Sequence, residues 1–476
     1  MKKFKRIATL CTAAACTAAL ALGLAACGNN QDDDRLQIVV LSAGYGDEWI
    51  SDIAEKYSAD TGVEVKLTPE YDAKRIISSH MASRNNPDVL YICTDTAWKT
   101  YAAQGKFLDL SDLLEEEVDG VKVSEKVNDE YADSIYYTDQ NGTRHCYRLP
   151  WTSGVGGIYY NAAMFEANPS WKIPTTFQEL LDLCETIVNA RIPVEGDRTA
   201  TVKPFVFTGQ NQDYFDYTVF TWWAQLAGTD AIDQFLQYSD ASSFATKSSD
   251  GSDLDNTYSK LKQATEYWSQ LITDEYCVAD CIGKSNHVAQ QNFVNGYAAM
   301  MFNGDWLYNE ILGYQSSGVG TDNFELGIMN APTVPDAQYT NVSYTVGEDQ
   351  FIAIPASSNM KEAAKDFIKY IISDDGISTF LNKAHGILAY KSSTEIQTDD
   401  TFMQSLLNFR STYSDTFTNF SDNLMYLSNV IDIWAIGSLR PYNAIYQETQ
   451  TVDEAFDSIQ STTAQNWTRW EESVGL

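Results

Sequence analysis

Three short segments of the sequence hold aspartate, and two of them add tyrosine; both side chains can hold a polar ligand. The segments are Gly44-Tyr45-Gly46-Asp47, Glu70-Tyr71-Asp72 and Thr94-Asp95-Thr96. Carboxylates accept hydrogen bonds, and tyrosine presents a flat ring with a hydroxyl at its tip. The chemistry they suggest is recognition of a small polar molecule. A second interpretation is that Asp47 and Asp95 cap the helices they precede, which is compatible with the first.

Each segment follows an apolar run typical of a buried strand, at residues 36–43, 63–67 and 88–93. Helical periodicity follows each run, first from Trp49 to a stop at Gly62, then over residues 72–83, and then up to about Gly105. Strands alternating with helices at this interval predict an α/β fold with a mostly parallel sheet. Such sheets bind ligands beyond the carboxyl ends of their strands, where the three segments lie.

Motifs for covalent, phosphate or metal chemistry are absent from the sequence. No Walker A, GxGxxG, HExxH or GxSxG pattern occurs, and the four histidines are scattered. The segment from Tyr137 to Arg148 lacks the first and last ligands of an EF-hand. We therefore expect no cofactor, no metal and no catalytic residues. The 65 acidic side chains leave a glycosidase open, because that chemistry needs only two placed carboxylates.

The N-terminus carries a pattern for export and acylation. Lys2, Lys3, Lys5 and Arg6 precede an apolar run that ends in Leu24-Ala25-Ala26-Cys27, which resembles a bacterial lipobox. We expect residues 1–26 to be a lipoprotein signal peptide, Cys27 to carry the lipid, and residues 27–35 to be a tether. An ordinary signal peptide and an uncleaved membrane helix are the alternatives.

Of the eight cysteines, Cys11 and Cys16 would leave with the signal peptide and Cys27 would carry the lipid. The other five are an odd number, which excludes a complete disulfide framework: Cys93, Cys146, Cys184, Cys277 and Cys281. Cys277 and Cys281 lie near His287, but no second ligand pair stands at zinc-site spacing. Buried free thiols or a single local bridge are expected.

Composition bounds the size and partners of the folded part. The chain has 476 residues, 44% of them hydrophobic and 13% aromatic, and a formal net charge of -33. That length predicts two or three compact lobes. The negative charge argues against nucleic acid, which is held mainly by Lys and Arg. Residues 261–272, 288–301 and 360–372 read as further helices.

Several segments in order along residues 36–460 resemble one known family. They include Pro87-Asp88-Val89-Leu90, Leu149-Pro150-Trp151, Ile158-Tyr159-Tyr160-Asn161, Pro174-Thr175-Thr176-Phe177, and the most specific stretch, Phe293 to Trp306. The sequence is similar to ABC-transporter extracellular solute-binding proteins of carbohydrate-binding family 1, the maltose-binding-protein-like lipoproteins. The resemblance implies two α/β lobes, a type II periplasmic-binding-protein-like fold, with strands crossing between them.

Carried onto this chain, the resemblance gives an N-terminal lobe of residues 36–152 with 338–390. The C-terminal lobe is then 153–337 with 391–476, and the crossings lie at Gly154–Gly157, near Pro335 and at Gly386–Tyr390. Closure about these hinges would trap a sugar or oligosaccharide.

The resemblance also implies roles for site residues. The position of Trp306 stacks on sugar in the family, although a core role is the alternative for a tryptophan. The full set of expected ligand residues is Trp306, Trp151, Asp95, Asp47, Tyr45, Tyr71, Asp305, Asn303, Trp223, Glu348, Asp349 and Trp434.

The function predicted from these observations is a lipid-anchored, monomeric receptor on the extracellular or periplasmic face of the cell membrane. It would bind sugar without chemistry and deliver it to ABC permease subunits. A secreted lipoprotein glycosidase and a binding protein for a non-sugar nutrient are the alternatives.

Overall fold

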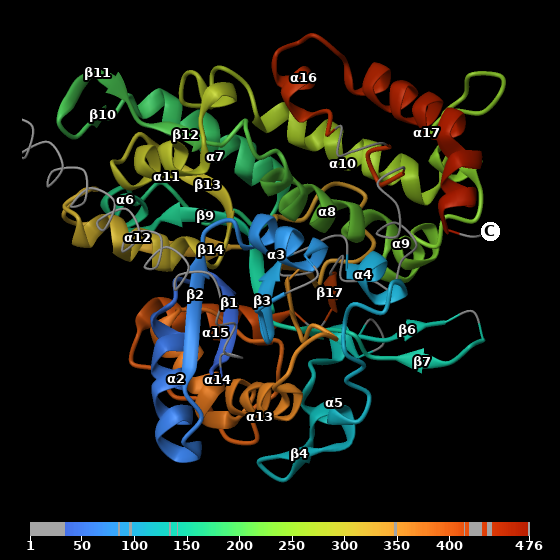
Figure 1. Ribbon diagram of the computed structural model, residues 1–476. Coiled ribbons are helices and arrows are strands. Elements are labelled where there is room, and N and C mark those ends of the chain that lie inside the picture. Colours follow the sequence, from blue (N-terminus) through green and yellow to red (C-terminus); the bar gives the residue numbers. More distant parts are fainter. Residues whose placement is uncertain are drawn as a thin grey trace, which may run out of the picture. The chain divides into compact units, whose positions relative to one another are not determined.

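The computed structural model describes residues 34–83, 86–94, 98–132, 135–139, 141–346, 350–413, 415–417, 431–435 and 440–474. Residues from Leu36 onward form one compact unit. Within it, two mixed sheets carry separate hydrophobic cores, which we call the first and second lobes (Figure 1). The α/β prediction is confirmed.

The first lobe is built on a five-stranded sheet in the order β2-β1-β3-β16-β8. Its main elements are β1 (Leu36–Leu41), α2 (Glu48–Thr61), β2 (Val65–Glu70), α3 (Ala73–Ala82), β3 (Leu90–Thr94), α4 (Trp98–Ala103), β4 (Glu117–Val118), β5 (Val121–Lys122), α5 (Val123–Lys126), β6 (Tyr137–Thr138), β7 (Arg144–His145), β8 (Leu149–Pro150), β16 (Gln350–Ala353), α13 (Lys361–Ile371) and α14 (Asp374–Lys383).

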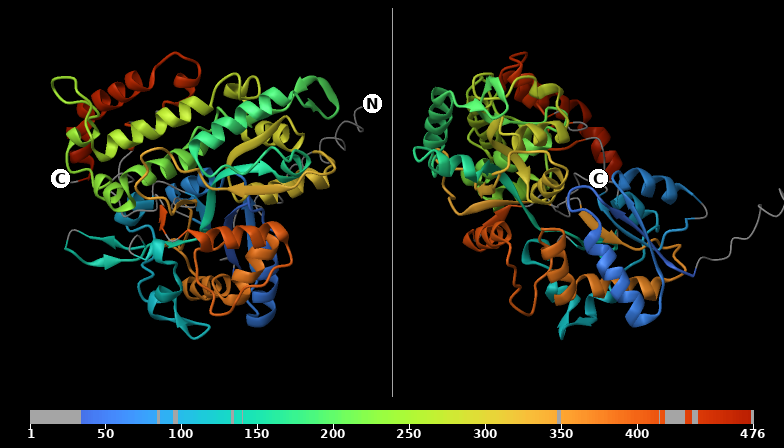
Figure 2. Two further views of the ribbon diagram at one scale, coloured as in Figure 1. Left: turned by 180° about the vertical axis from the view of Figure 1, so that it is seen from behind. Right: turned by 90° about the vertical axis from the view of Figure 1, so that its left-hand side faces the viewer.

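Strands β1, β2 and β3 are parallel, as the sequence predicted. Strand β16 runs antiparallel to its two neighbours, β3 and β8. Helix α2 ends where expected: Gly62 has φ 75°, a left-handed conformation that glycine adopts at little cost. The apolar stripe of α13 buries Phe367, Ile368 and Ile371 in the first core. Helices α2, α13 and α14 pack together beside the sheet (Figure 2).

The second lobe is built on a sheet in the order β12-β13-β9-β15-β17, with β14 also paired to β9. Its main elements are β9 (Gly154–Asn161), α6 (Ala162–Ala167), α7 (Phe177–Ala190), β10 (Pro193–Val194), β11 (Asp197–Thr201), β12 (Lys203–Val206), α8 (Asp213–Ala227), α9 (Thr229–Phe235), α10 (Thr257–Leu271), α11 (Asn286–Val294), β13 (Ala298–Gly304), α12 (Leu307–Ser316), β14 (Leu326–Met329), β15 (Val342–Val346), α15 (Thr401–Thr412), β17 (Asp415–Phe417), α16 (Tyr442–Tyr446) and α17 (Val452–Val474).

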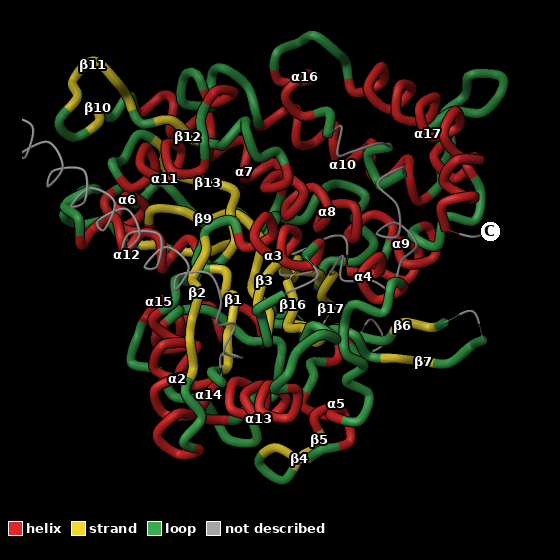
Figure 3. The backbone as a smooth tube through the Cα atoms, viewed as in Figure 1, coloured by secondary structure: helices red, strands yellow, loops and turns green. Residues whose placement is uncertain are grey.

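One secondary-structure prediction was wrong. The helix expected over residues 288–301 ends at Val294, and residues 298–304 form strand β13 (Figure 3). Gly296, with φ 77°, turns the chain, and every residue of β13 is buried because the strand lies between β12 and β9. A short apolar run of this kind has no periodicity that separates a strand from a buried helix.

The chain passes between the two sheets three times. The first crossing joins β8 to β9 through residues 151–153, and the third joins α14 to α15. The second was expected near Pro335. Because β15 pairs with β9 while β16 pairs with β3, it falls instead between Val346 and Gln350. The proposed lobe boundary at residue 338 moves accordingly.

Candidate ligand site between the lobes

Trp306 lies where the two lobes touch. It directly precedes α12, is partly buried, and packs against the hydrophobic cores of both lobes. Gly44, in the loop after β1, faces it so closely that an added Cβ would stand 3.0 Å from the Trp306 Cβ. Gly44 also has φ 70°, so a larger residue would be strained there. Because Gly44 has no side chain, the Trp306 side chain can pack directly against the loop that follows β1.

Three tyrosine rings surround the Trp306 indole. The ring centroids of Tyr45, Tyr214 and Tyr217 lie 6.3, 6.1 and 6.1 Å from it, at interplanar angles of 82°, 77° and 85°. Such edge-to-face contacts fix the plane of an aromatic ring. Tyr45 comes from the first lobe, while Tyr214 and Tyr217 lie three apart on α8 of the second.

A buried hydrogen bond joins the lobes beside Trp306. The Tyr45 hydroxyl donates to Oδ1 of Asp305 at 2.8 Å, and Asp305 is 0% exposed. Burial raises the pKa of Asp305 from 3.8 to about 7, although the bond from Tyr45 acts in the opposite direction. Its Oδ2 has no hydrogen-bond partner. A Cβ on Gly154 would stand 2.0 Å from Oδ1, so only glycine fits at the start of β9.

A second set of polar contacts crosses between the lobes farther along α12. Asn309 donates through Nδ2 to the Gly44 carbonyl at 2.9 Å. The Tyr71 hydroxyl, at the end of β2, lies 3.3 Å from Nε2 of His287 on α11. Nδ1 of His287 lies in turn 2.9 Å from the Tyr314 hydroxyl. Tyr71 is 59% exposed, so this contact is open to solvent.

Behind His287 the chain of contacts ends at a carboxyl. Tyr314 donates to Oε1 of Gln290 at 2.9 Å, and Gln290 donates through Nε2 to Glu310 at 2.5 Å. Burial raises the pKa of Glu310 to about 7. Nearby, Asn286 donates to the Tyr214 hydroxyl at 3.3 Å and leaves its own Oδ1 buried without a partner. The lobe contact therefore offers both donors and acceptors around an indole.

The structure brings four of the predicted ligand residues to this contact: Tyr45, Tyr71, Asp305 and Trp306. Asp47 is partly exposed at the start of α2, and its side chain makes no capping hydrogen bond; only its carbonyl accepts from Ser51. The capping interpretation of Asp47 is therefore wrong for its side chain.

Four other predicted residues lie inside the cores. Trp151 is 0% exposed and stacks on Trp49 with centroids 5.8 Å apart. Trp223 and Trp434 are 0% and 2% exposed in the second core, and Asn303 is 0% exposed in β13. Core packing occupies the three indoles, Trp151 in the first lobe and Trp223 and Trp434 in the second. The assignment of these four residues as ligand contacts remains a prediction that this arrangement does not favour.

Four predicted positions fall outside the described residues: Asp95, Glu348, Asp349 and the lipidation site Cys27. Conversely, sequence reasoning missed five residues at the lobe contact: Tyr214, Tyr217, His287, Asn309 and Glu310. The three-residue spacing of Tyr214 and Tyr217 on a helix was the one available signal, since the others depend on how the lobes meet.

All five cysteines of the described residues are buried free thiols, with no bridge between Cys277 and Cys281. In the same part of the chain, no group of three or more His, Cys, Asp or Glu side chains could hold a metal ion. None of the helices described there is long and apolar enough to cross a membrane.

Comparison with known proteins agrees with this architecture. Residues 52–404 match the family described as bacterial extracellular solute-binding protein. The chain belongs to this family. It is 23% identical to the diacetylchitobiose-binding protein DasA of Streptomyces coelicolor over 397 residues, which cover 79% of this chain and 81% of that protein. It is also 23% identical to the multiple sugar-binding protein of Streptococcus mutans, over 70% of each.

Solved structures share the fold. A chitin-oligosaccharide-binding protein has a TM-score of 0.65 at 18% identity, covering 90% of this chain and 98% of its own. The raffinose complex of RafE has a TM-score of 0.63 at 16% identity, covering 90% and 99%. The solute-binding protein described here therefore has the two-lobed type II fold, and its relatives are binding proteins rather than enzymes.

Proposed function

We propose that this solute-binding protein captures a neutral sugar or oligosaccharide between its lobes by hinge closure. The observation that carries the proposal is Trp306, a partly buried indole that packs on both cores beside polar groups from both lobes. Sugars pair an apolar C–H face with a rim of hydroxyls. The Trp306 ring suits the face, and the Tyr71, Tyr214, His287 and Glu310 side chains suit the rim.

The relatives support the class of ligand. Their names refer to diacetylchitobiose, multiple sugars, chitin oligosaccharides and raffinose. The ligand class that these names share is a saccharide, which fits a lobe contact made by carboxyl, amide, imidazole and phenol groups.

Direct binding measurements test the proposal. A library of mono- and oligosaccharides is screened by thermal shift, since a ligand that binds only the folded protein raises its melting temperature, and hits are titrated by calorimetry. Trp306→Ala should weaken the best ligand at least about tenfold, or about 1.4 kcal/mol. Trp467→Ala is the matched control, because Trp467 is a partly buried tryptophan of α17 whose ring contacts that of Trp470 at a tilt.

Equal affinity of Trp306→Ala and the parent would remove Trp306 from the site. Turnover is checked on the same hits by chromatography of the incubated sugars. Stoichiometric recovery of intact sugar is expected, and released product would identify a glycosidase instead.

The proposal includes an extracellular membrane anchor and delivery to an ABC permease. Signal peptidase would cleave before Cys27, and a diacylglycerol on its thiol would hold the monomeric protein at the membrane surface. Mass spectrometry of the mature N-terminal peptide tests this, with Cys27→Ser as the control that should release soluble protein. An unmodified Cys27, or a mature start elsewhere, would contradict the anchor.

A further inference from the structure

The three crossings between the lobes are bonded to one another. In the first and third, Ser153 N donates to the Ile387 carbonyl at 2.8 Å, and Ala389 N donates to the Trp151 carbonyl at 3.0 Å. The first and second crossings are linked by Thr152, whose hydroxyl donates to Oε1 of Gln350 at 2.6 Å. The crossings therefore meet at one place and must respond together when the lobes move.

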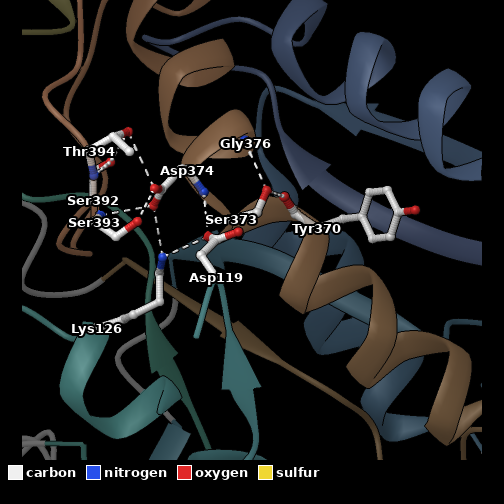
Figure 4. A network of polar contacts seen from close by, with 9 residues as sticks. All are labelled: Asp119, Lys126, Tyr370, Ser373, Asp374, Gly376, Ser392, Ser393 and Thr394. Carbon is white, nitrogen blue, oxygen red and sulfur yellow. Dashed lines mark hydrogen bonds and ion pairs between the residues drawn. The ribbon is translucent and has the colours of Figure 1, made fainter. Parts of the chain in front are cut away.

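The third crossing is fastened to the first lobe as far as Thr394 (Figure 4). Lys126 is buried and pairs with Asp119 at 2.9 Å and Asp374 at 3.0 Å. Asp374 accepts from Ser393 N at 3.0 Å and from the Ser393 and Thr394 hydroxyls. Burial alone would raise the pKa of Asp374, but the bonds from Ser393 and Lys126 outweigh it and hold the pKa well below its usual range.

Helix α15 begins at Thr401 and packs on β14 and the second core. The third crossing therefore leaves its last fastening to the first lobe at Thr394 and enters the second lobe by Thr401, although Ile387 already packs against the second core. Movement of the lobes displaces α15 relative to the fastened segment.

From α15, Arg410 reaches back to the first lobe. Its guanidinium donates to Oε1 of Glu130 at 2.7 Å, and their side chains are 18% and 13% exposed. Glu130 lies in the 3-10 turn Asp129–Tyr131, whose Tyr131 belongs to the first core. Arg410 also donates to the Thr345 hydroxyl at 3.1 Å, one residue before the end of β15.

The same carboxylate engages the first crossing, because the Ser153 hydroxyl donates to Oε1 of Glu130 at 2.7 Å. Burial acts to raise the pKa of Glu130. The charge of Arg410 and the hydrogen bonds from Ser153 and Arg410 outweigh burial, so the pKa of Glu130 is lowered overall. In the described arrangement, Arg410 compensates the charge of the largely buried Glu130. Separating the lobes at this point would break that ion pair.

We propose that Arg410 and Glu130 form an interlobe clasp at the hinge, which favours the arrangement with the lobes in contact. On the proposed function, Arg410 is a positioning residue that acts on capture through closure. Arg410 also acts on Asp305, whose pKa it lowers against the larger effect of burial.

The test separates the clasp from an ordinary stabilising ion pair. The variants are Arg410→Met, which keeps the aliphatic stem, and Glu130→Gln, which keeps the shape and the bond from Ser153. The control is Asp129→Asn, which removes the exposed neighbouring pair of Lys391 with Asp129, 2.7 Å long and within the first lobe. Circular dichroism and thermal unfolding show which variants are folded.

Closure is measured in ligand-free protein by trapping two introduced thiols, one in each lobe, with a short bismaleimide cross-linker. Tyr71→Cys with His287→Cys places two thiols across the contact, and the described native cysteines are buried. The trapping rate follows the fraction of molecules with the lobes in contact. We expect each clasp variant to trap about tenfold more slowly than its parent, and Asp129→Asn to trap at the parent rate. Small-angle X-ray scattering is the second measurement of closure. If the parent is mostly closed, the clasp variants should have a larger radius of gyration than the parent.

Unchanged trapping and scattering in folded Arg410→Met would overturn the clasp, even if that variant were less stable. Sugar affinity is measured separately. A parent that binds no saccharide would contradict the proposed function while leaving the trapping result, and hence the clasp, to be judged on its own.

Discussion

Asp305 should make the protein less stable as the pH rises, through a single buried carboxyl. Burial raises its folded-state pKa from 3.8 to about 7, so the folded protein holds this proton over a range in which the unfolded chain has lost it. The contribution is fully favourable below pH 3.8, declines as the pH rises, and reaches its limit above pH 7. Between pH 5 and pH 8 the loss is about 2 to 3 kcal/mol, at about 1.36 kcal/mol per unit.

The assay compares the free energy of unfolding of the parent with that of Asp305→Asn, by urea titration at both pH values. The amide can still accept a hydrogen bond from Tyr45 and does not ionise. Between pH 5 and pH 8 the free energy of unfolding of the parent should therefore fall by about 2 to 3 kcal/mol relative to that of Asp305→Asn. Asp322→Asn, at an exposed position of the same lobe, is the control and should show no such shift.

Besides global unfolding, opening of the lobes would also let water reach the charged Asp305 carboxylate, because its hydrogen bond with Tyr45 lies at the lobe contact. If that route is taken, the loss of stability will be smaller, and the radius of gyration of the parent will rise between pH 5 and pH 8. A parent that shows neither the stability shift nor the expansion would refute the assignment of a buried, proton-holding Asp305.

Three further predictions concern stability and reactivity. Thr176→Ala should cost about 1 kcal/mol in urea titration, because Thr176 and Glu179 form a capping box at the start of α7, whereas Thr186→Ala in the exposed part of that helix should cost less; equal costs would contradict the capping role. Trp151→Ala should cost about 3 to 5 kcal/mol by leaving a cavity against Trp49 and Phe380, and a near-neutral result would show that the indole is not core. The thiols of Cys146, Cys184, Cys277 and Cys281 should resist Ellman's reagent at pH 8 until urea unfolds the chain, since burial raises the pKa of each, and fast labelling of the folded protein would contradict it.

Local signals determined much of the first lobe from sequence alone. Apolar runs, helical stripes and Gly62 are properties of neighbouring residues, and they located β1, α2, β2, α3 and β3 within a few residues. The run at residues 298–304 defeated the same reasoning, because whether it pairs as a strand depends on β12 and β9, which lie far away in the chain.

The site residues, too, were in part predictable from sequence and in part decided by the tertiary structure. Order and spacing of motifs were enough to indicate the family, and the twelve ligand residues predicted with it include the four that lie at the lobe contact: Tyr45, Tyr71, Asp305 and Trp306. Burial, by contrast, is decided by the whole fold: Trp151, Trp223 and Trp434 look like Trp306 in sequence, yet the cores enclose them and leave Trp306 between the lobes. The partners of Arg410 are likewise a tertiary fact, since Glu130 lies 280 residues away and meets it only where the three crossings converge.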